Sequence, residues 1–360
     1  MNQTLQIGII GAGDISRQYL ATFDASPSVR VVAIAAAHIQ RAEAAAAGRD
    51  ARACTVDSLL ASPDIDLVVN LTPPAQHARL NDAAIAAGKS VYSEKPLAAT
   101  PTETHALVDA GAKAGVSVGC APDTFLGTGL QTTARALADG MIGEPFAATA
   151  IWGGPGPEPW HPNPQFFYET GGGPVLDMGP YYVTALVAHL GPVAAVHAGS
   201  RTTDRARIVG SGPLKGTKLH VDVPTYATAI LEHTSGVLST VTLSFETFAG
   251  MGGLEIYGTG GTLRLPDPNM FDERGSAALA DDPTQWRELV PSGGYAGLGR
   301  GVGAIEMWAA RRARRPARAS GELAAHIIEV LTAINSGGTT VIGTRPPTPS
   351  LVPLGSTPMD

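Results

Sequence analysis

The sequence is poor in cysteine and in charge, and each shortage excludes a class of protein. Its two cysteines, Cys54 and Cys120, cannot build a disulfide framework, so we expect a cytoplasmic protein. Only 16% of the residues are charged and the formal net charge is −7, which argues against a nucleic-acid partner because such a partner requires a basic surface. No apolar run approaches the roughly 20 residues that span a bilayer. Met1–Thr4 also lacks the basic start of a secretory signal, so we expect neither a membrane segment nor secretion.

Apolar residues are abundant, at 44%, and a length of 360 residues favours two domains. The first 120 residues alternate between short β-rich runs and Ala-rich segments with helical spacing, which is typical of a doubly wound parallel sheet. After Pro122 strands predominate, and the partial alternation over 237–243 indicates a mostly antiparallel sheet with one exposed face. We therefore predict an α/β protein with domains over 1–122 and 123–343, followed by a proline-rich tail over 344–360 that is extended or disordered.

The predicted elements can be given by residue range. In the first half the strands are Leu5–Ile10, Val29–Ala35, Ile65–Leu71, Ser90–Ser93 and Val116–Cys120, and the helices are Ile15–Phe23, Ile39–Ala47, Gln76–Ala87 and Thr102–Ala114. In the second half the strands are Phe146–Trp152, Val193–Thr202, Thr225–Glu232, Val237–Phe245, Leu254–Tyr257 and Thr262–Leu265, and the helices are Leu130–Ala138, Val302–Arg312 and Gly321–Ile334.

A glycine turn after the first predicted strand indicates a dinucleotide site. Gly11 permits a tight turn, Gly13 lets the backbone approach a pyrophosphate, and the helix start at Asp14 and Ile15 supplies free N–H groups. The third glycine of the usual pattern is replaced by Ser16. A purely structural glycine turn is the alternative.

The residues after the second predicted strand bear on the choice of cofactor. An acid there binds the ribose 2′-hydroxyl of NAD, but this sequence has Ala36 instead. His38 and Arg41 follow and can accept a 2′-phosphate, which favours NADP over NAD. The alternative is that these two side chains are only the solvated start of a helix.

Polar residues follow two more predicted strands, where doubly wound sheets bind ligands. Leu71, Thr72 and Pro74 belong to one loop, and His77 is expected to cap or orient that cofactor loop. Glu94 and Lys95 follow the next strand. The chain has only five lysines, and Lys95 lies between an acid and a proline, so we expect its ammonium to face the cleft. No cluster of His, Cys and Asp has metal-ligand spacing, so we expect no metal.

Several short motifs resemble the Gfo/Idh/MocA oxidoreductase family, which includes glucose–fructose oxidoreductase and inositol dehydrogenase. The motifs are the Gly11–Gly13 loop, Thr72-Pro73-Pro74-x-x-His77, Ala87-Gly88-Lys89-x-Val91, Glu94-Lys95-Pro96-Leu97-Ala98 and Gly171-Gly172-Gly173-x-x-Leu176-x-Asp177-x-Gly179. The resemblance covers nearly the whole chain. It implies an N-terminal Rossmann domain, a C-terminal α/β domain with an open-faced sheet, NAD or NADP as cofactor, and Lys95 as the active-site lysine.

One departure from the family pattern concerns the acid/base. Many members have a histidine four residues after the motif's aspartate and an acid three residues further on, but here these positions are Tyr181 and Thr184. Tyrosine at that point resembles the glucose–fructose oxidoreductase and ketoreductase branches, which implies that Tyr181 is the acid/base, with Tyr182 as its rival. Asp177 can orient this group or bind a sugar hydroxyl. Helix packing for the tyrosines and helix capping for Asp177 are the structural alternatives.

Other candidates for the substrate pocket are weaker. Asp123 and Thr124 follow the next predicted strand at a cleft-facing end, and Trp160 and His161 lie in an irregular Gly- and Pro-rich loop. Aromatic rings over a polar pocket suit the apolar faces of a sugar, although a structural role is open for each. The arginines over 311–315 are expected to end a helix rather than to bind nucleic acid.

The leading interpretation is an NAD(P)-dependent oxidoreductase that transfers hydride to or from a carbon of a sugar, sugar derivative or cyclitol. A tightly held cofactor that supports glycoside processing or sugar–sugar redox is one alternative, and a non-catalytic nucleotide sensor is another. The one-sided sheet predicts a homodimer or homotetramer through the C-terminal domain.

Overall fold

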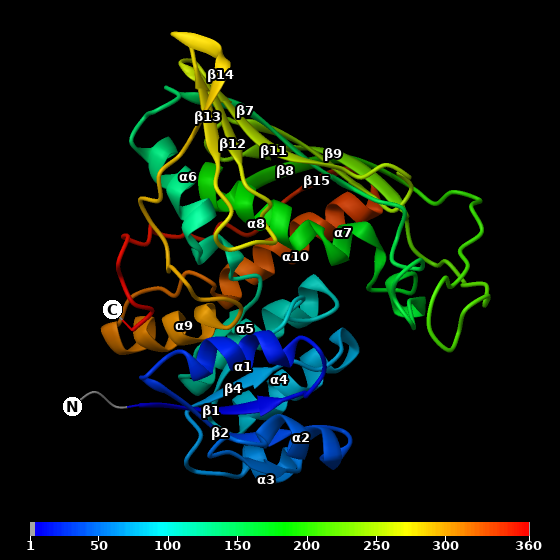
Figure 1. Cartoon of the computed structure of the whole chain (residues 1–360), viewed down its shortest axis with the longest axis vertical. Helices are drawn as coiled ribbons and strands as arrows, with labels where there is room; N and C mark the ends of the chain where they lie inside the picture. The colour runs from blue at the N-terminus through cyan, green and yellow to red at the C-terminus, as the bar shows by residue number, and fades with distance from the viewer. Residues whose placement is uncertain (1–3, 360) are drawn as a thin grey trace. The chain divides into compact units, whose positions relative to one another are not determined.

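The computed structural model describes residues 4–359, and the chain divides into two compact units (Figure 1). The first unit comprises the chain through Gln131 together with Ser292–Ala325 and the residues from Pro349 onward. The second unit comprises Thr132–Pro291 and His326–Thr348. The second half of the chain therefore contributes to both units, which differs from the expected single change of domain at residue 122.

The first unit contains a six-stranded parallel sheet with strand order β3-β2-β1-β4-β5-β6. Every residue of β4 and β5 is buried, as expected for strands covered on both faces. The strand order reverses between β1 and β4, which confirms the doubly wound fold. The strands are β1 (Leu5–Ile10), β2 (Val29–Ala35), β3 (Arg52–Cys54), β4 (Leu67–Asn70), β5 (Ser90–Ser93) and β6 (Val118–Cys120), and the helices between them are α1 (Ser16–Asp24), α2 (Ile39–Ala46), α3 (Val56–Leu60), α4 (His77–Ala86) and α5 (Pro101–Ala114).

The segment over 292–325 returns to this unit and adds α9 (Val302–Ala313) and the start of α10 (Gly321–Ser336). Arg311 and Arg312 lie in the last turn of α9, and Arg315 pairs with the buried carboxylate of Glu306. The arginine run therefore ends a helix and pairs with an acid on it, as predicted.

The tail is an extended, packed arm. The Val352 N–H donates to Gln131 Oε1 at 2.6 Å, and the Val352 carbonyl accepts from Gly294 N–H at 2.9 Å. Val352 is itself buried, so this part of the tail is anchored to the first unit.

The second unit is built on a nine-stranded sheet with order β14-β13-β12-β11-β7-β10-β9-β8-β15. Among the described strands of this nine-stranded sheet, only the β7–β10 pair is parallel, so the sheet is mostly antiparallel, as predicted. The strands are β7 (Pro145–Gly153), β8 (Val193–Arg201), β9 (Tyr226–His233), β10 (Leu238–Ser244), β11 (Met251–Gly258), β12 (Gly261–Leu265), β13 (Ser276–Leu279), β14 (Asp282–Glu288) and β15 (Gly338–Val341), and the helices are α6 (Thr128–Ala138), α7 (Gly173–Asp177) and α8 (Gly179–Leu190).

The nine-stranded sheet is one-sided. Buried and exposed residues alternate along β9 and β10. Figure 1 shows α7 and α8 along one face of this sheet. On the opposite face Ile230, Leu238 and Val341 are exposed. This confirms the predicted open-faced sheet. Among the described helices of the whole chain, none is long and apolar enough to cross a membrane.

Candidate active site

The glycine turn between β1 and α1 is open at the point where a pyrophosphate is expected. Gly11 has φ +109°, and a Cβ there would lie 2.6 Å from the Leu71 backbone, so only glycine fits. A Cβ at Gly13 would meet nothing within 4 Å. Within the described chain, the N–H groups of residues 12–15, which include Asp14 and Ile15, form no backbone hydrogen bond. The turn therefore offers unpaired donors at a helix N-terminus, and these fit a dinucleotide pyrophosphate.

Ser16 occupies the position of the third glycine in the usual dinucleotide-binding pattern. Its side chain is 3% exposed, and its hydroxyl donates to the Gly13 carbonyl at 2.6 Å. The serine therefore closes the turn from the protein side and leaves the outer side open.

The end of β2 lies beside this turn, since Gly11 N–H donates to the Ala35 carbonyl at 2.8 Å. Ala36 is half-buried, and residues 37–41 are exposed and contain no acid. His38 precedes α2 without a side-chain cap, and neither its ring nor the Arg41 guanidinium has a partner in the described part of the chain. Both side chains are available to solvent at the strand end.

Two buried asparagines and a histidine hold the loop after β4. Asn70 Oδ1 accepts from the N–H of Thr72 at 3.2 Å and from its hydroxyl at 2.7 Å. The His77 ring, which is fully buried, lies with Nε2 2.7 Å from the Thr72 carbonyl and Nδ1 2.6 Å from the Pro96 carbonyl. Asn81 Nδ2 donates to the Leu97 carbonyl at 3.0 Å. His77 and Asn81 thus join the loop after β4 to the loop that carries Lys95. Pro74 begins an exposed 3-10 turn in the first of these loops.

Glu94 holds the other side of Lys95. Its Oε2 accepts from the Lys95 N–H at 2.9 Å and its Oε1 accepts from the buried Tyr19 hydroxyl at 2.8 Å. Burial and the Glu94 carboxylate raise the pKa of Tyr19 well above its ordinary value, so the phenol stays a donor. Glu94 is only 9% exposed, and both its oxygens are engaged within the protein. It fixes the Lys95 backbone instead of presenting its carboxylate to a cofactor.

Lys89, which belongs to the motif Ala87-Gly88-Lys89-x-Val91, has a structural role. Lys89 is 7% exposed, and its ammonium donates to the carbonyl oxygens of Ser62 at 2.6 Å and Ile65 at 3.1 Å. Lys95, in contrast, is half-exposed at the carboxyl end of β5. Of these two lysines, only Lys95 lies at the ligand-binding edge of the sheet.

Asp123 and Thr124 do not behave as the expected substrate ligands. Asp123 is fully buried, and its Oδ2 accepts from the N–H groups of Gly301 at 2.8 Å and Gly303 at 2.9 Å at the start of α9. Burial raises the pKa of Asp123 to about 6. Thr124 is 1% exposed. Both residues face inward, because the returning segment of the chain covers this strand end.

The remaining candidate residues of the second unit lie where α7 ends and α8 begins. Asp177 ends α7, and Tyr181 is the third residue of α8, with only Met178 between the helices. Asp177 is half-buried and does not cap α8, whose cap position is Met178. Tyr181 is 6% exposed and Tyr182 is 3% exposed. Burial, together with Asp267 and Glu273, raises the pKa of Tyr182 well above its ordinary value, which disfavours Tyr182 as a base.

Trp160 and His161 belong to an exposed aromatic cluster. The His161 ring centroid lies 5.4 Å from that of Trp160, 5.4 Å from that of Phe166 and 5.3 Å from that of Phe167. Trp160 is 65% exposed. The structure groups these two residues with the phenylalanines of the same loop.

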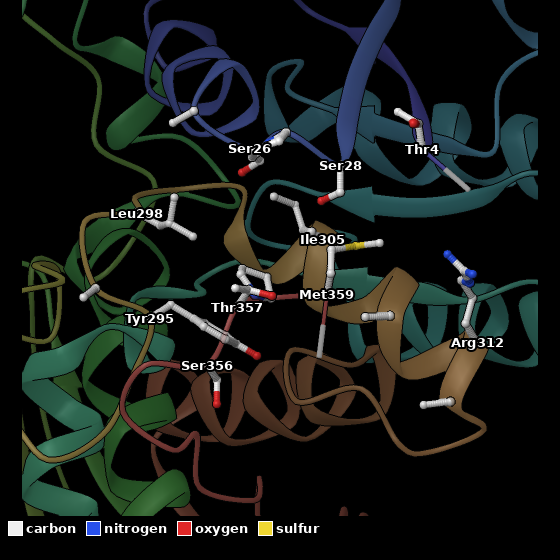
Figure 2. A pocket seen from close by; sticks show the side chains of 16 residues that line it. Thr4, Ser26, Ser28, Tyr295, Leu298, Ile305, Arg312, Ser356, Thr357 and Met359 are labelled. Atoms are coloured by element: carbon white, nitrogen blue, oxygen red, sulfur yellow. The ribbon is translucent and has the colours of Figure 1, made fainter. Parts of the chain in front are cut away.

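A cavity of about 850 Å³ in the first unit lies away from the glycine turn (Figure 2). Thr4, Ser26 and Ser28 line it at the amino ends of β1 and β2, and Ser356 and Met359 close it from the tail. Its lining contains no carboxylate, histidine or cysteine side chain. The titratable side chains among its lining residues are those of Tyr295 and Arg312. Over residues 4–359, no group of three or more His, Cys, Asp or Glu side chains is placed to hold a metal ion.

Comparisons with known proteins define the class. Residues 5–121 match the family model described as "Oxidoreductase family, NAD-binding Rossmann fold", and residues 130–264 match the GFO/IDH/MocA C-terminal domain. The chain belongs to the GFO/IDH/MocA oxidoreductase family. It is therefore an enzyme of the NAD-binding oxidoreductase type, and the alternative of a non-catalytic sensor is set aside.

Among similar proteins, a 1,5-anhydro-D-fructose reductase of Ensifer adhaerens is 28% identical over 263 residues, which cover 71% of this chain and 74% of that protein. A dTDP-3,4-didehydro-2,6-dideoxy-alpha-D-glucose 3-reductase of Streptomyces antibioticus is 30% identical over 269 residues, which cover 72% of this chain and 75% of that protein. The structure of a levoglucosan dehydrogenase in complex with NADH and levoglucosan has a TM-score of 0.79 at 20% identity, covering 94% of this chain and all of that one. This last likeness establishes the fold.

Proposed function

We propose that this protein is an NAD(P)-dependent dehydrogenase or reductase that transfers hydride between the nicotinamide and a carbon of a sugar, sugar derivative or cyclitol. The observation that carries the proposal concerns the loop with Lys95, which is held by hydrogen bonds from His77, Asn81 and Glu94. This loop lies at the same edge of the sheet as the open glycine turn. β1, β4 and β5 are neighbours, so strand spacing separates the two loops by about 10 Å. A reactive lysine and a pyrophosphate site thus lie within the length of one dinucleotide.

The unpaired N–H groups of residues 12–15 would hold the pyrophosphate, and the loop with Leu71, Thr72 and Pro74 would flank it. When bound, the nicotinamide supplies the hydride acceptor or donor. We propose a preference for NADP over NAD, supported by Ala36 in place of an acid and by the exposed His38 and Arg41.

In the oxidative direction the substrate hydroxyl loses its proton as the carbon loses hydride. Tyr181 is the proposed proton acceptor, and in the reductive direction it returns the proton to the new alkoxide. The proposed role of the Lys95 ammonium is to stabilise the charge that develops on the substrate oxygen. Asp177 is proposed to accept a hydrogen bond from a second substrate hydroxyl.

The experiment is a panel of neutral sugars and cyclitols offered with NAD+ or NADP+, followed by the ultraviolet absorbance of the reduced cofactor. Oxidation of at least one member, with a lower KM for NADP+, supports the proposal. Binding of cofactor without turnover of any sugar or cyclitol in either direction contradicts it. Loss of the cofactor on gel filtration distinguishes a released cofactor from a tightly held one.

The exposed sheet face suggests an oligomer. Ile230, Leu238 and Val341 are each at least 45% exposed. Such a face favours self-association, and we propose a homodimer or homotetramer through it. Light scattering tests this, and a mass of one chain for the native protein contradicts it. A cytoplasmic location is part of the proposal, favoured by the two free cysteines and an intracellular cofactor.

A further inference from the structure

Tyr19 lies on α1, the helix that begins at the glycine turn, and its side chain reaches the loop that carries Lys95. Tyr19 is fully buried, and its hydroxyl donates to Glu94 Oε1 at 2.8 Å. The other oxygen of that carboxylate, Oε2, accepts from the Lys95 N–H at 2.9 Å. A single carboxylate therefore joins a side chain of α1 to the backbone of Lys95. The function proposed above gives Tyr19 no role.

The bond from Tyr19 restrains the Glu94 carboxylate strongly. Glu94 is only 9% exposed, and a carboxylate this deeply buried is costly unless its oxygens accept hydrogen bonds. Hydrogen bonds to a charged oxygen are about twice as strong as those between neutral groups. Burial, with the charge of Glu94, raises the pKa of Tyr19 well above its ordinary value, so the phenol keeps the proton that it donates.

The Tyr19 ring is itself held by the start of α9. Gly301 has φ +98° and lies so close that a Cβ there would be 2.9 Å from Tyr19 Cδ1. The Gly301 N–H donates to Asp123 Oδ2 at 2.8 Å, which fixes this backbone. Phe23 packs edge-on against the Tyr19 ring, with 6.2 Å between the ring centroids. These contacts leave the ring little room to turn, so its hydroxyl has a fixed direction.

The residues that precede α9 also bond to α1. The Gly299 N–H donates to Thr22 Oγ1 at 3.2 Å, and Arg300 Nε donates to Gln18 Oε1 at 3.0 Å. Gln18 and Thr22 are four residues apart and share one face of the helix, beside Tyr19. The returning segment of the chain therefore holds α1 in place, and Tyr19 passes that position on to Glu94.

We propose that Tyr19 is a positioning residue for Lys95, whose backbone it fixes through Glu94 relative to α1. The inference rests on the proposed function, which gives Lys95 its chemistry and the first turn of α1 the pyrophosphate. A lysine held from α1 keeps its place relative to whatever that first turn binds. A misplacement of about 1 Å can lower a rate by about 10²-fold, so this restraint contributes directly to catalysis.

Tyr19→Phe tests the proposal because it removes the hydroxyl and leaves the buried ring. Tyr92→Phe is the matched control. Tyr92 lies on β5 and is also fully buried, but its hydroxyl has no hydrogen-bond partner in the described chain. Burial and, to a lesser extent, the nearby Asp123 carboxylate raise the pKa of Tyr92, so this phenol is neutral as well. Each variant loses one buried phenol oxygen, and only Tyr19→Phe loses a bond to Glu94.

Amide hydrogen exchange of the full-length protein without added cofactor measures the restraint. The Lys95 N–H should exchange at least about fivefold faster in Tyr19→Phe, because Glu94 Oε1 loses its donor and the carboxylate can turn away. The amide of Val68, a buried residue of β4, should keep its native rate in both variants. Tyr92→Phe should match the native protein at both amides.

Two results of the exchange experiment overturn the proposal. The first is an unchanged rate at Lys95 in Tyr19→Phe. The second is an equal acceleration at Lys95 and Val68, which marks a loss of stability throughout the unit instead of a local release.

Steady-state kinetics with a sugar that the native protein turns over give the second readout. The kcat of Tyr19→Phe should fall by about tenfold or more, while the sugar KM and the cofactor Kd change by less than about threefold, because the glycine turn is intact. Tyr92→Phe should keep the native kcat. An equal loss of kcat in the two variants, or a rise in KM alone, overturns the proposal.

The exchange readout separates this proposal from the proposed function because it needs no turnover. Faster exchange at Lys95 in Tyr19→Phe, in a protein that turns over no sugar or cyclitol, supports the link from α1 to Lys95 and contradicts the proposed function. Turnover that Lys95→Met abolishes and Tyr19→Phe leaves unchanged supports the function and contradicts the positioning role of Tyr19.

Discussion

The His77 ring hydrogen-bonds the carbonyl of Pro96, the residue after Lys95, with Nδ1 2.6 Å from that oxygen. Its other nitrogen lies 2.7 Å from the Thr72 carbonyl. A buried imidazole therefore joins the loop expected to contact the cofactor to the loop that carries Lys95. The expected role of His77 in orienting the cofactor loop remains a prediction, and this contact is its physical basis.

Replacing His77 should impair both stability and catalysis. His77→Ala removes two buried hydrogen bonds and is expected to cost about 2–4 kcal/mol of unfolding free energy. It should also lower kcat, because the loop that carries Lys95 loses its hydrogen bond to the His77 ring. His220→Ala is the control, since the His220 side chain is 80% exposed and its pair with Asp222 contributes little. Urea unfolding and steady-state kinetics of the two variants would contradict this account if they gave the same values.

The buried carboxyl of Asp123 predicts a pH-dependent stability. Its pKa is raised from 3.8 to about 6 in the folded protein, so the native state holds the proton more tightly than the unfolded chain does. The contribution of the protonated Asp123 carboxyl to the free energy of unfolding is full below pH 3.8 and is lost as the pH rises through about 6. The loss is on the order of 3 kcal/mol.

Asp123→Asn should remove this dependence, because the amide oxygen still accepts from the two glycine N–H groups but does not ionise. Unfolding midpoints of the native protein and the variant at pH 4.5 and 7 test the prediction. A parallel fall of both proteins between these pH values argues against a raised pKa at Asp123.

The end of β2 should decide between the two cofactors. Ala36→Asp places a carboxylate where the 2′-phosphate of NADP is expected, so the Kd for NADP should rise at least tenfold while NAD binding is kept or improved. Ala37→Ser, at the next residue, adds no charge and serves as the control. Fluorescence titration measures both constants, and an unchanged ratio of the NADP and NAD constants contradicts the assignment.

Substitutions of the two neighbouring tyrosines, Tyr181 and Tyr182, should differ in their effect on kcat. Tyr181→Phe is expected to lower kcat for a monosaccharide by about 10²–10⁴-fold, because it removes the proposed acid/base. Tyr182→Phe should leave that kcat within about twofold, because its phenol does not exchange protons at neutral pH. A large loss of kcat in Tyr182→Phe alone would exchange the two assignments.

Much of the first unit can be predicted because its signals are local. β1, β2 and β5 begin and end at the predicted residues, since each is a short apolar run bounded by turn residues. The glycine turn follows from the same pattern. The three-residue β3 and the five-residue α3 were not predicted, because segments of that length show no periodicity.

The sheet edges of the second unit were also not predicted. Every residue of β15 is exposed, and β14 is exposed over nearly all its length, so neither strand has the alternation by which a strand is recognised. The role of Asp123 depends on Gly301, 178 residues away in the chain. A contact of that separation leaves no local pattern, and the position at a strand end predicted a ligand instead.

The central claim is that Lys95 performs chemistry rather than cofactor binding, and Lys95→Met tests it most directly. The variant keeps the length and apolar stem of the side chain and loses only the ammonium. With a sugar that the native protein oxidises, kcat/KM should fall by at least about 10³-fold while the Kd for the cofactor changes by less than about threefold. Turnover by Lys95→Met at the rate of the native protein would contradict the claim.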